Sequence, residues 1–322
     1  MKQKLRNVKF ALLMGLVLPY LFLSFGVTLL DRYRQQTLPE PAARAETEPG
    51  HDKVSLPVRF RTGEEIVTEM DMDAYLVGVV LAEMPASFET EALKAQSCVA
   101  RTYARKAWVT GGKHGDGSVC GEPACCQGWR REEDYLAAGG TREAVEKVRT
   151  AVAATSGWVL TYDGNLIEAT YFSCSGGRTE DAVAVWGMEY PYLQSVDSPG
   201  EEAAACFTDT KTLSLAEFRE TLDLPGDSTA LGMTTYTEGG GVHTMVIGGK
   251  TFTGTRLRSL LGLRSTAFSM TLGDSEVCIT TRGYGHRVGM SQYGADAMAL
   301  SGSSWQEILS HYYPGTEVTR LS

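Results

Sequence analysis

The chain has 322 residues, of which 43% are hydrophobic and 21% are charged, and its formal net charge is −9. This length and composition suit one large folded domain or two ordinary ones, and they exclude a wholly disordered or collagen-like protein. The acidic charge disfavours nucleic-acid binding, which needs clustered Lys and Arg, and the lack of a Walker motif or a dinucleotide fingerprint disfavours a nucleotide enzyme.

The first feature in chain order is an uncharged run over residues 10–30, FALLMGLVLPYLFLSFGVTLL. A helix of this length can cross a hydrocarbon core of about 30 Å. Lysines and an arginine precede it, which by the positive-inside rule places residues 1–9 in the cytoplasm. We expect a single transmembrane anchor rather than a cleaved signal peptide, because the run is longer than a signal core and no clear small-x-small cleavage site follows it.

Residues 31–54 are expected to be a linker. The part over residues 37–54 is rich in Pro, Glu and Ala and has no apolar period, which is typical of a solvated tether. Residues 55–322 are then predicted to form one extracytoplasmic domain of a single-pass cell-membrane protein.

The elements expected in this domain mix helices with hairpins and lack a βαβ alternation. This order indicates an α+β fold, with helices and antiparallel sheet around a central cleft. Strands are expected over residues 58–67 and 277–281, and hairpins over 157–173 and 243–252. The periodic segments predict helices over residues 71–84, 87–108, 141–155, 214–222, 290–300 and 304–312.

Glu83 is the one carboxylate in the apolar segment 75–84, YLVGVVLAEM. On a helix it shares a face with Leu76, Val79 and Val80. A carboxyl group in such surroundings has a raised pKa and stays protonated closer to neutral pH, which is the state that a general acid needs. The alternative is a carboxylate at a helix end that reaches water just before a proline.

Two cations follow on one face of the next expected helix. Lys94 and Arg101 lie seven residues apart, with Cys98 between them. A chain reversal would let this pair face Glu83, where it could bind an acidic substrate or orient the carboxylate. The alternative is a solvated surface stripe, the commoner place for Lys and Arg.

The loop over residues 111–128 gathers one imidazole and three thiols: His114, Cys120, Cys125 and Cys126. These groups can close a tetrahedral zinc site that has no open position for catalysis. In an extracytoplasmic protein, a disulfide from Cys120 to one of the other two cysteines is the alternative. Cys174 and Cys206 are a further candidate disulfide, proposed only because these two cysteines remain and lie beside loops expected at the cleft.

Three segments resemble, in family order, the stage II sporulation protein D family of peptidoglycan lytic transglycosylases. They are residues 80–104 (VLAEMPASFETEALKAQSCVARTYA), 171–180 (YFSCSGGRTE) and 285–295 (GHRVGMSQYGA). Residues 261–268 (LGLRSTAF) match more loosely. The resemblance covers the chain from about residue 58 to the C-terminus, and includes the N-terminal anchor.

The resemblance implies cleavage of glycan strands between N-acetylmuramic acid and N-acetylglucosamine, with a 1,6-anhydro product, during engulfment in sporulation. The family's catalytic glutamate falls on Glu83, and its basic positions fall on Lys94 and Arg101. It also implies a complex with a cell-wall amidase and endopeptidase and a multi-spanning membrane protein. Some relatives carry a His/Cys cluster, which favours a structural zinc here, with no cofactor required for catalysis.

Two glycine-containing segments are predicted to contact the glycan, because glycines let the backbone approach a ligand and sugars need nearby hydroxyl and amide groups. Their predicted contact residues are Tyr171, Ser173, Ser175, His286, Ser291, Gln292 and Tyr293. Tight structural turns are the alternative. The rival functions are a non-catalytic wall-binding amidase enhancer, and a thiol enzyme that uses Cys98 or Cys174 with His286.

Overall fold

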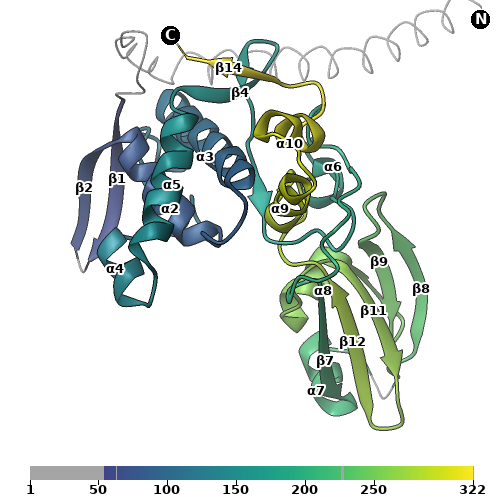
Figure 1. The fold of residues 1–322 in the computed structure, drawn as a ribbon. Coiled ribbons are helices and arrows are strands. Elements are labelled where there is room, and N and C mark those ends of the chain that lie inside the picture. Colours follow the sequence, from purple (N-terminus) through teal and green to yellow (C-terminus); the bar gives the residue numbers. More distant parts are fainter. Residues whose placement is uncertain (1–53, 63, 226–227, 322) are drawn as a thin grey trace, which may run out of the picture. The chain divides into compact units, whose positions relative to one another are not determined.

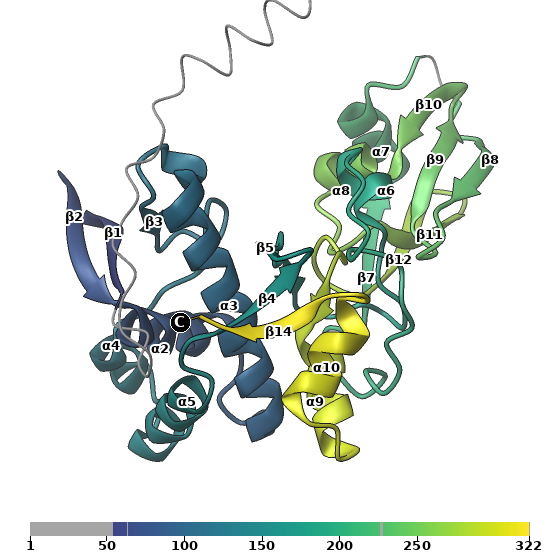
Figure 2. The ribbon, with the colours of Figure 1, turned by 90° about the horizontal axis from the view of Figure 1, so that it is seen from above.

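The computed structural model describes residues 54–62, 64–225 and 228–321. Its helices are α2 (Met72–Glu83), α3 (Thr90–Thr110), the 3₁₀ helix η1 (Gly112–His114), α4 (Glu132–Ala137), α5 (Arg142–Ala154), α6 (Ala182–Trp186), α7 (Leu215–Leu222), α8 (Gly254–Leu261), α9 (Gln292–Leu300) and α10 (Trp305–Tyr312). Figures 1 and 2 show α2, α3 and α5 packed together, and Figure 2 shows α9 and α10 on the side of α3 opposite α5.

The strands form several small sheets rather than one large sheet. In one sheet the strand order is β2 (Glu64–Asp71), β1 (Ser55–Thr62), β3 (Val119–Cys120). In a second sheet the order is β14 (Glu317–Arg320), β4 (Trp158–Tyr162), β5 (Asn165–Leu166). The third sheet is the pair β13 (Met290–Ser291) and β6 (Tyr171–Phe172). Two more sheets come from the middle of the chain: β11 (Ala267–Leu272), β12 (Glu276–Arg282), β7 (Thr208–Ser214) and β10 (Lys250–Thr253), β9 (Val242–Ile247), β8 (Leu231–Tyr236).

Buried apolar side chains form two separate cores. The first core joins α2, α3, α5, β4 and α10, and includes Leu76, Val99 and Leu160. The second core lies within residues 213–279 and is centred on Phe218 and Ile279. The amide of Gly283 donates to the carbonyl of Phe207 (2.8 Å), so the chain leaves the first core and returns to it at neighbouring points.

The α+β class is observed, but the predicted fold is corrected in its membrane-spanning helix and in part of its strand pairing. It included a membrane-spanning helix, and no helix within the residues that the structure describes is both long and apolar enough to cross a membrane. The segment expected to span, residues 10–30, lies outside the described residues, as do residues 1–9 and the linker up to residue 53.

The predicted antiparallel pairing is observed for most strand pairs, but not for all. β1 pairs with β3 in parallel, and β13 pairs with β6 in parallel. The second pairing replaces the far arm of the hairpin expected over residues 157–173. The first part of that hairpin does form: β4 pairs with β5 across a turn at Asp163 and Gly164, both of which have positive φ.

Candidate active site

Glu83 is the last residue of α2. The helix begins at the side-chain cap of Asp71, whose carboxylate accepts from the amide of Ala74 (3.0 Å). It ends because Met84 is extended (φ −126°, ψ 138°), the conformation that a residue before proline adopts. The predicted apolar neighbours of Glu83 on α2 are fully buried: Leu76, Val79 and Val80.

Two opposing effects act on the Glu83 carboxyl group. Burial raises its pKa, and a hydrogen bond from the backbone amide of Gly128 to Oε1 lowers it. Burial is the larger effect, so the pKa of Glu83 lies above the ordinary value. The group is therefore protonated to a higher pH than an exposed glutamate, which suits a proton donor.

The carboxyl group borders an open pocket of about 340 Å³. The wall of this pocket comes from four parts of the chain: the end of α2 with the following turn, one residue of α4, the residue after β6, and the start of α9. Its lining residues are Leu81, Ala82, Glu83, Met84, Pro85, Ala86, Tyr135, Ser173, Gln292 and Tyr293. Glu83 is the only carboxylate among these lining residues.

Three of the predicted glycan contacts therefore meet Glu83 at one pocket. Ser173 follows β6, and Gln292 and Tyr293 begin α9, so the β13–β6 pairing brings together residues that are 119 positions apart or more. The ring of Tyr293 packs edge-on against Phe88 (4.9 Å between centroids). This polar and aromatic lining is of the kind that sugars bind.

Tyr171 does not line the pocket but lies close to Glu83. Its hydroxyl donates to Oε1 of Gln127 (3.1 Å), the residue next to Gly128. Burial, with a further contribution from the charge of Glu83, raises the pKa of Tyr171 well above its ordinary value. Tyr171 therefore stays protonated and supports the segment that donates to Glu83.

The structure does not bring the two predicted cations to the pocket. Lys94 pairs with Glu91 one turn earlier on α3 (2.6 Å). Arg101 is 0% exposed, pairs with Asp73 (2.6 Å) and donates to the carbonyls of Thr155 and Val152. Arg101 thus fastens α3 to α2 and α5 instead of reaching the pocket.

His286 is likewise held within the fold. Its ring packs between Phe172 and Trp186, with centroid distances of 5.6 and 5.2 Å, and its Nδ1 accepts from the amide of Val288. Burial, with the nearby charge of Arg258, lowers the pKa of His286 to about 4, so the ring is neutral near pH 7. It is not among the lining residues of the pocket.

Ser175 and Ser291 are buried and donate to the same carboxylate, that of Glu201. Cys174 and Cys206, the candidate disulfide, are both free thiols in the structure. Cys174 donates instead to Oε2 of Glu201 (3.2 Å). Burial, with the charge of Glu201, raises the pKa of the Cys174 thiol, which opposes a role as a nucleophile.

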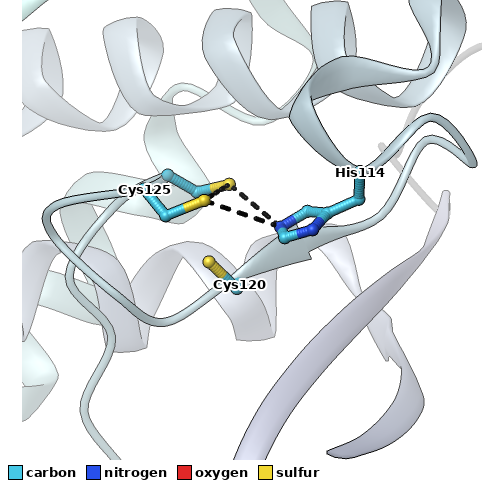
Figure 3. Close-up of side chains that lie close together, drawn as sticks. His114, Cys120 and Cys125 are labelled. Carbon is cyan, nitrogen blue, oxygen red and sulfur yellow. Dashed lines mark hydrogen bonds between the residues drawn. The ribbon is translucent and has the colours of Figure 1, made fainter.

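The four predicted metal ligands do lie together. The ligand atoms of His114, Cys120, Cys125 and Cys126 all fall within 4.8 Å of one another. Figure 3 shows the sulfur atoms facing the imidazole of His114, whose Nε2 lies 3.9 Å from Sγ of Cys125 and 3.6 Å from Sγ of Cys126. Tetrahedral zinc with Zn–S bonds of about 2.3 Å separates its ligand atoms by roughly 3.7 Å, so this set fits the ion.

Sequence reasoning missed the residues that connect this cluster to Glu83. Gln127 and Gly128 follow Cys126 directly; Gln127 accepts from Tyr171 and Gly128 donates to Glu83. Tyr135, which lines the pocket, was also missed because α4 was not predicted. One sequence signal could have indicated them: residues 127–128 directly follow Cys125 and Cys126, so a loop that gathers the cysteines also fixes these two residues.

Comparison with known proteins places the chain among sporulation proteins. A sequence model described as "Stage II sporulation protein" matches residues 61–162. The chain is 37% identical over 310 residues to stage II sporulation protein D of Bacillus subtilis (strain 168), covering 94% of this chain and 90% of that protein. It is 39% identical over 272 residues to stage II sporulation protein D of Bacillus amyloliquefaciens, covering 83% and 79%.

A third relative has a different name. The chain is 31% identical over 303 residues to a Bacillus subtilis (strain 168) protein named amidase enhancer, covering 76% of this chain and 40% of that protein. The chain therefore resembles both sporulation proteins and a protein named for assisting an amidase.

Proposed function

The chain belongs to the stage II sporulation protein D family, and from that premise we propose that it is a peptidoglycan lytic transglycosylase that cuts glycan strands between N-acetylmuramic acid and N-acetylglucosamine during engulfment. The observation that carries the proposal is the half-buried Glu83 carboxyl group, with its raised pKa, at a polar and aromatic pocket.

In the proposed reaction, Glu83 acts first as an acid and then as a base. Its proton goes to the glycosidic oxygen as the bond from that oxygen to C1 of the muramic acid breaks. The C6 hydroxyl of the same sugar then attacks C1, and the Glu83 carboxylate accepts the hydroxyl proton. The products are a 1,6-anhydro end and a free hydroxyl, and Glu83 is protonated again.

A single carboxylate is sufficient for this chemistry. Hydrolytic glycosidases use two carboxyl groups, one for the leaving group and one for water or covalent attack. Here the nucleophile is part of the substrate and is already close to C1, so proximity takes the place of the second group. The pocket lining supports this reading, because Glu83 is its one acidic residue.

The test is digestion of purified glycan strands by the full chain, with mass spectrometry of the products. We expect anhydro ends from the native chain and a loss of at least about 100-fold in rate for Glu83→Gln. Glu89→Gln, which changes an exposed carboxylate six residues away, should keep its activity. Incorporation of water at the new ends, or equal cleavage by Glu83→Gln, would overturn the proposal.

We also propose that the His114 cluster holds a structural zinc ion. Such an ion would fix the loop that ends at Gly128, and it would have no open position for substrate. Metal analysis of the purified chain should find one equivalent of zinc that Cys126→Ser loses. Cys278→Ser, which changes a thiol outside the cluster on β12, should retain it. A full chain purified without zinc from zinc-containing medium would contradict the assignment.

The second candidate function is a wall-binding amidase enhancer, favoured by the relative of that name. It predicts that the native chain binds strands without cutting them and speeds a partner amidase. Glu83→Gln should then enhance the amidase as well as the native chain does. The strand-digestion experiment separates the two functions, because only the transglycosylase releases anhydro ends by itself.

The proposed substrate also implies a place and partners. Peptidoglycan lies outside the cytoplasm, so we propose that the described body acts there, beside a cell-wall amidase and endopeptidase and a multi-spanning membrane protein. Co-purification of these proteins with the full chain from sporulating cells tests this part of the proposal.

A further inference from the structure

We propose that Glu201 is a positioning residue: its buried carboxylate holds together the two chain segments that form the polar wall of the pocket, and so controls how tightly a glycan strand binds. This inference rests on the proposed function of the pocket. Glu201 is 1% exposed and is not itself a lining residue, so any effect on substrate passes through its neighbours.

One oxygen of Glu201 holds the turn after β6. Oε2 accepts from the amides of Ser175 (2.8 Å) and Gly176 (3.0 Å), from the Ser175 hydroxyl (2.8 Å) and from the Cys174 thiol (3.2 Å). These contacts fix the backbone immediately after Ser173, which lines the pocket. Two of the donors are backbone amides that cannot turn away.

The other oxygen holds the start of α9. Oε1 accepts from the hydroxyls of Ser198 (2.8 Å) and Ser291. Ser291 is the N-cap of α9 and accepts from the amide of Gly294 (3.2 Å), so its position sets that of the next two residues, Gln292 and Tyr293. Both of these line the pocket.

The two held segments also meet each other. The amide of Tyr293 donates to the carbonyl of Ser173 (3.0 Å), which closes the wall directly beside Glu201. The fold leaves room for this arrangement at Gly294, where a Cβ atom would lie 2.7 Å from Oε1 of Glu201 and 2.0 Å from the hydroxyl of Tyr312. Glu201 is therefore the common acceptor of a closely packed junction.

Six groups donate to this carboxylate, four to Oε2 and two to Oε1. Glutamine has almost the same shape but can present its carbonyl oxygen to only one of the two sets. Its NH₂ group then faces donors in the other set, which must turn or move. Glu201→Gln should thus loosen one half of the wall and leave α2, with Glu83, in place.

The experiment measures strand binding and steady-state kinetics with the full chain. In a Glu83→Gln background, Glu201→Gln should weaken binding of purified strands at least about fivefold; in the active chain it should raise KM by a similar factor and keep kcat within about threefold. Glu202→Gln, at the exposed neighbouring position, should change neither. Ser291→Ala removes one donor and should raise KM in the same direction by a smaller factor.

A merely structural role predicts a different result. It lowers the amount of folded protein, so kcat falls while KM and the strand affinity of the folded fraction stay constant. A fall in kcat with constant KM would overturn the inference. So would unchanged strand binding in Glu201→Gln, or a native chain that binds no strands. Strands that bind the native chain but are not cut would overturn the proposed activity alone.

Discussion

At the scale of single residues, the burial of Glu83 should lower the unfolding free energy of the chain at a pH where its carboxyl group is ionised. A carboxyl group whose pKa is raised in the folded state stabilises the fold below its unfolded pKa, about 4.3, and that stabilisation is lost as pH rises through the folded pKa. Glu83→Gln does not titrate. We therefore expect Glu83→Gln to exceed the native chain in unfolding free energy at neutral pH, by on the order of 1 kcal/mol.

The check is denaturant unfolding of both chains from pH 4 to pH 8. The difference between them should grow with pH, and the same folded pKa should appear as the alkaline limb of kcat/KM for strand cleavage, because only the protonated form donates. A difference that shrinks as pH rises would show that the hydrogen bond from Gly128, and not burial, dominates the pKa of Glu83.

Arg101 gives a second prediction at this scale. Its guanidinium is fully buried and paired with Asp73. Arg101→Ala therefore removes the cation beside Asp73, which keeps its hydrogen bond from the Ser156 hydroxyl (2.7 Å), and opens a space beside Thr155. We expect a loss of about 3–5 kcal/mol in unfolding free energy with an unchanged KM in the folded fraction. Lys94→Ala, which breaks a surface pair, should cost less than about 1 kcal/mol. A raised KM with native stability would instead place Arg101 at the substrate.

At the scale of elements, α2 depends on a glycine for its contact with the loop that carries Gly128. A Cβ atom at Gly78 would lie 2.2 Å from Nε1 of Trp129, and the Gly78 carbonyl accepts from the amide of Arg130 (3.1 Å). The missing side chain thus lets Trp129 lie against the helix, which fixes Gly128 beside Glu83.

Gly78→Ala should therefore destabilise the chain, by about 1–3 kcal/mol through overpacking, although Gly→Ala inside a helix usually stabilises by about 0.5–1 kcal/mol. Thermal unfolding of Gly78→Ala, Trp129→Ala and the double variant tests the contact. The two losses should be less than additive, because the indole that clashes is gone in the double variant. Additive losses would contradict a direct contact.

The same elements show what the sequence can and cannot predict. The end of α2 and the start of α7 were predictable because their signals are local. A proline follows α2, and a capping box between Ser214 and Glu217 precedes α7. The start of α3 was not. The predicted helix starts at residue 87, but α3 begins at Thr90, after Glu89, whose amide donates to Asp296 on α9 (2.7 Å), a partner 207 residues away.

The site follows the same rule. The apolar neighbours of Glu83 on α2, and the grouping of His114 with three cysteines, could be predicted because these residues are close in sequence as well as in space. The positions of Ser173, Gln292 and Tyr293 at one pocket depend on the parallel pairing of β6 with β13, which no local pattern encodes. Arg101 was misplaced for the same reason, since its partner Asp73 lies on another helix.

At the scale of the whole molecule, the two cores predict two unfolding transitions. No buried residue belongs to both, and the second core is built from residues 213–279 alone. Phe218→Ala should lower the stability of the second core by about 3–5 kcal/mol, and Leu160→Ala, in the first core, should act on the first transition. Residue-resolved hydrogen exchange on the full chain can assign each transition. One transition, equally shifted by both variants, would show that the cores unfold as a unit.

The close approach of Phe207 and Gly283 has a consequence for how relatives diverge. A segment whose two ends lie close together can be exchanged with little change to the scaffold if its other contacts with that scaffold are kept. Here those contacts include the amide of Gly241, which donates to Glu180 (3.0 Å), and the carbonyl of Gly239, which accepts from Arg287 (2.7 Å). If Glu83 cuts glycan strands as proposed, the 75 positions between Phe207 and Gly283 are a place where binding specificity can change while the Glu83 pocket stays the same. Under the proposed function, chimaeras that exchange this segment between relatives should keep strand cleavage at Glu83 and change only the binding preference.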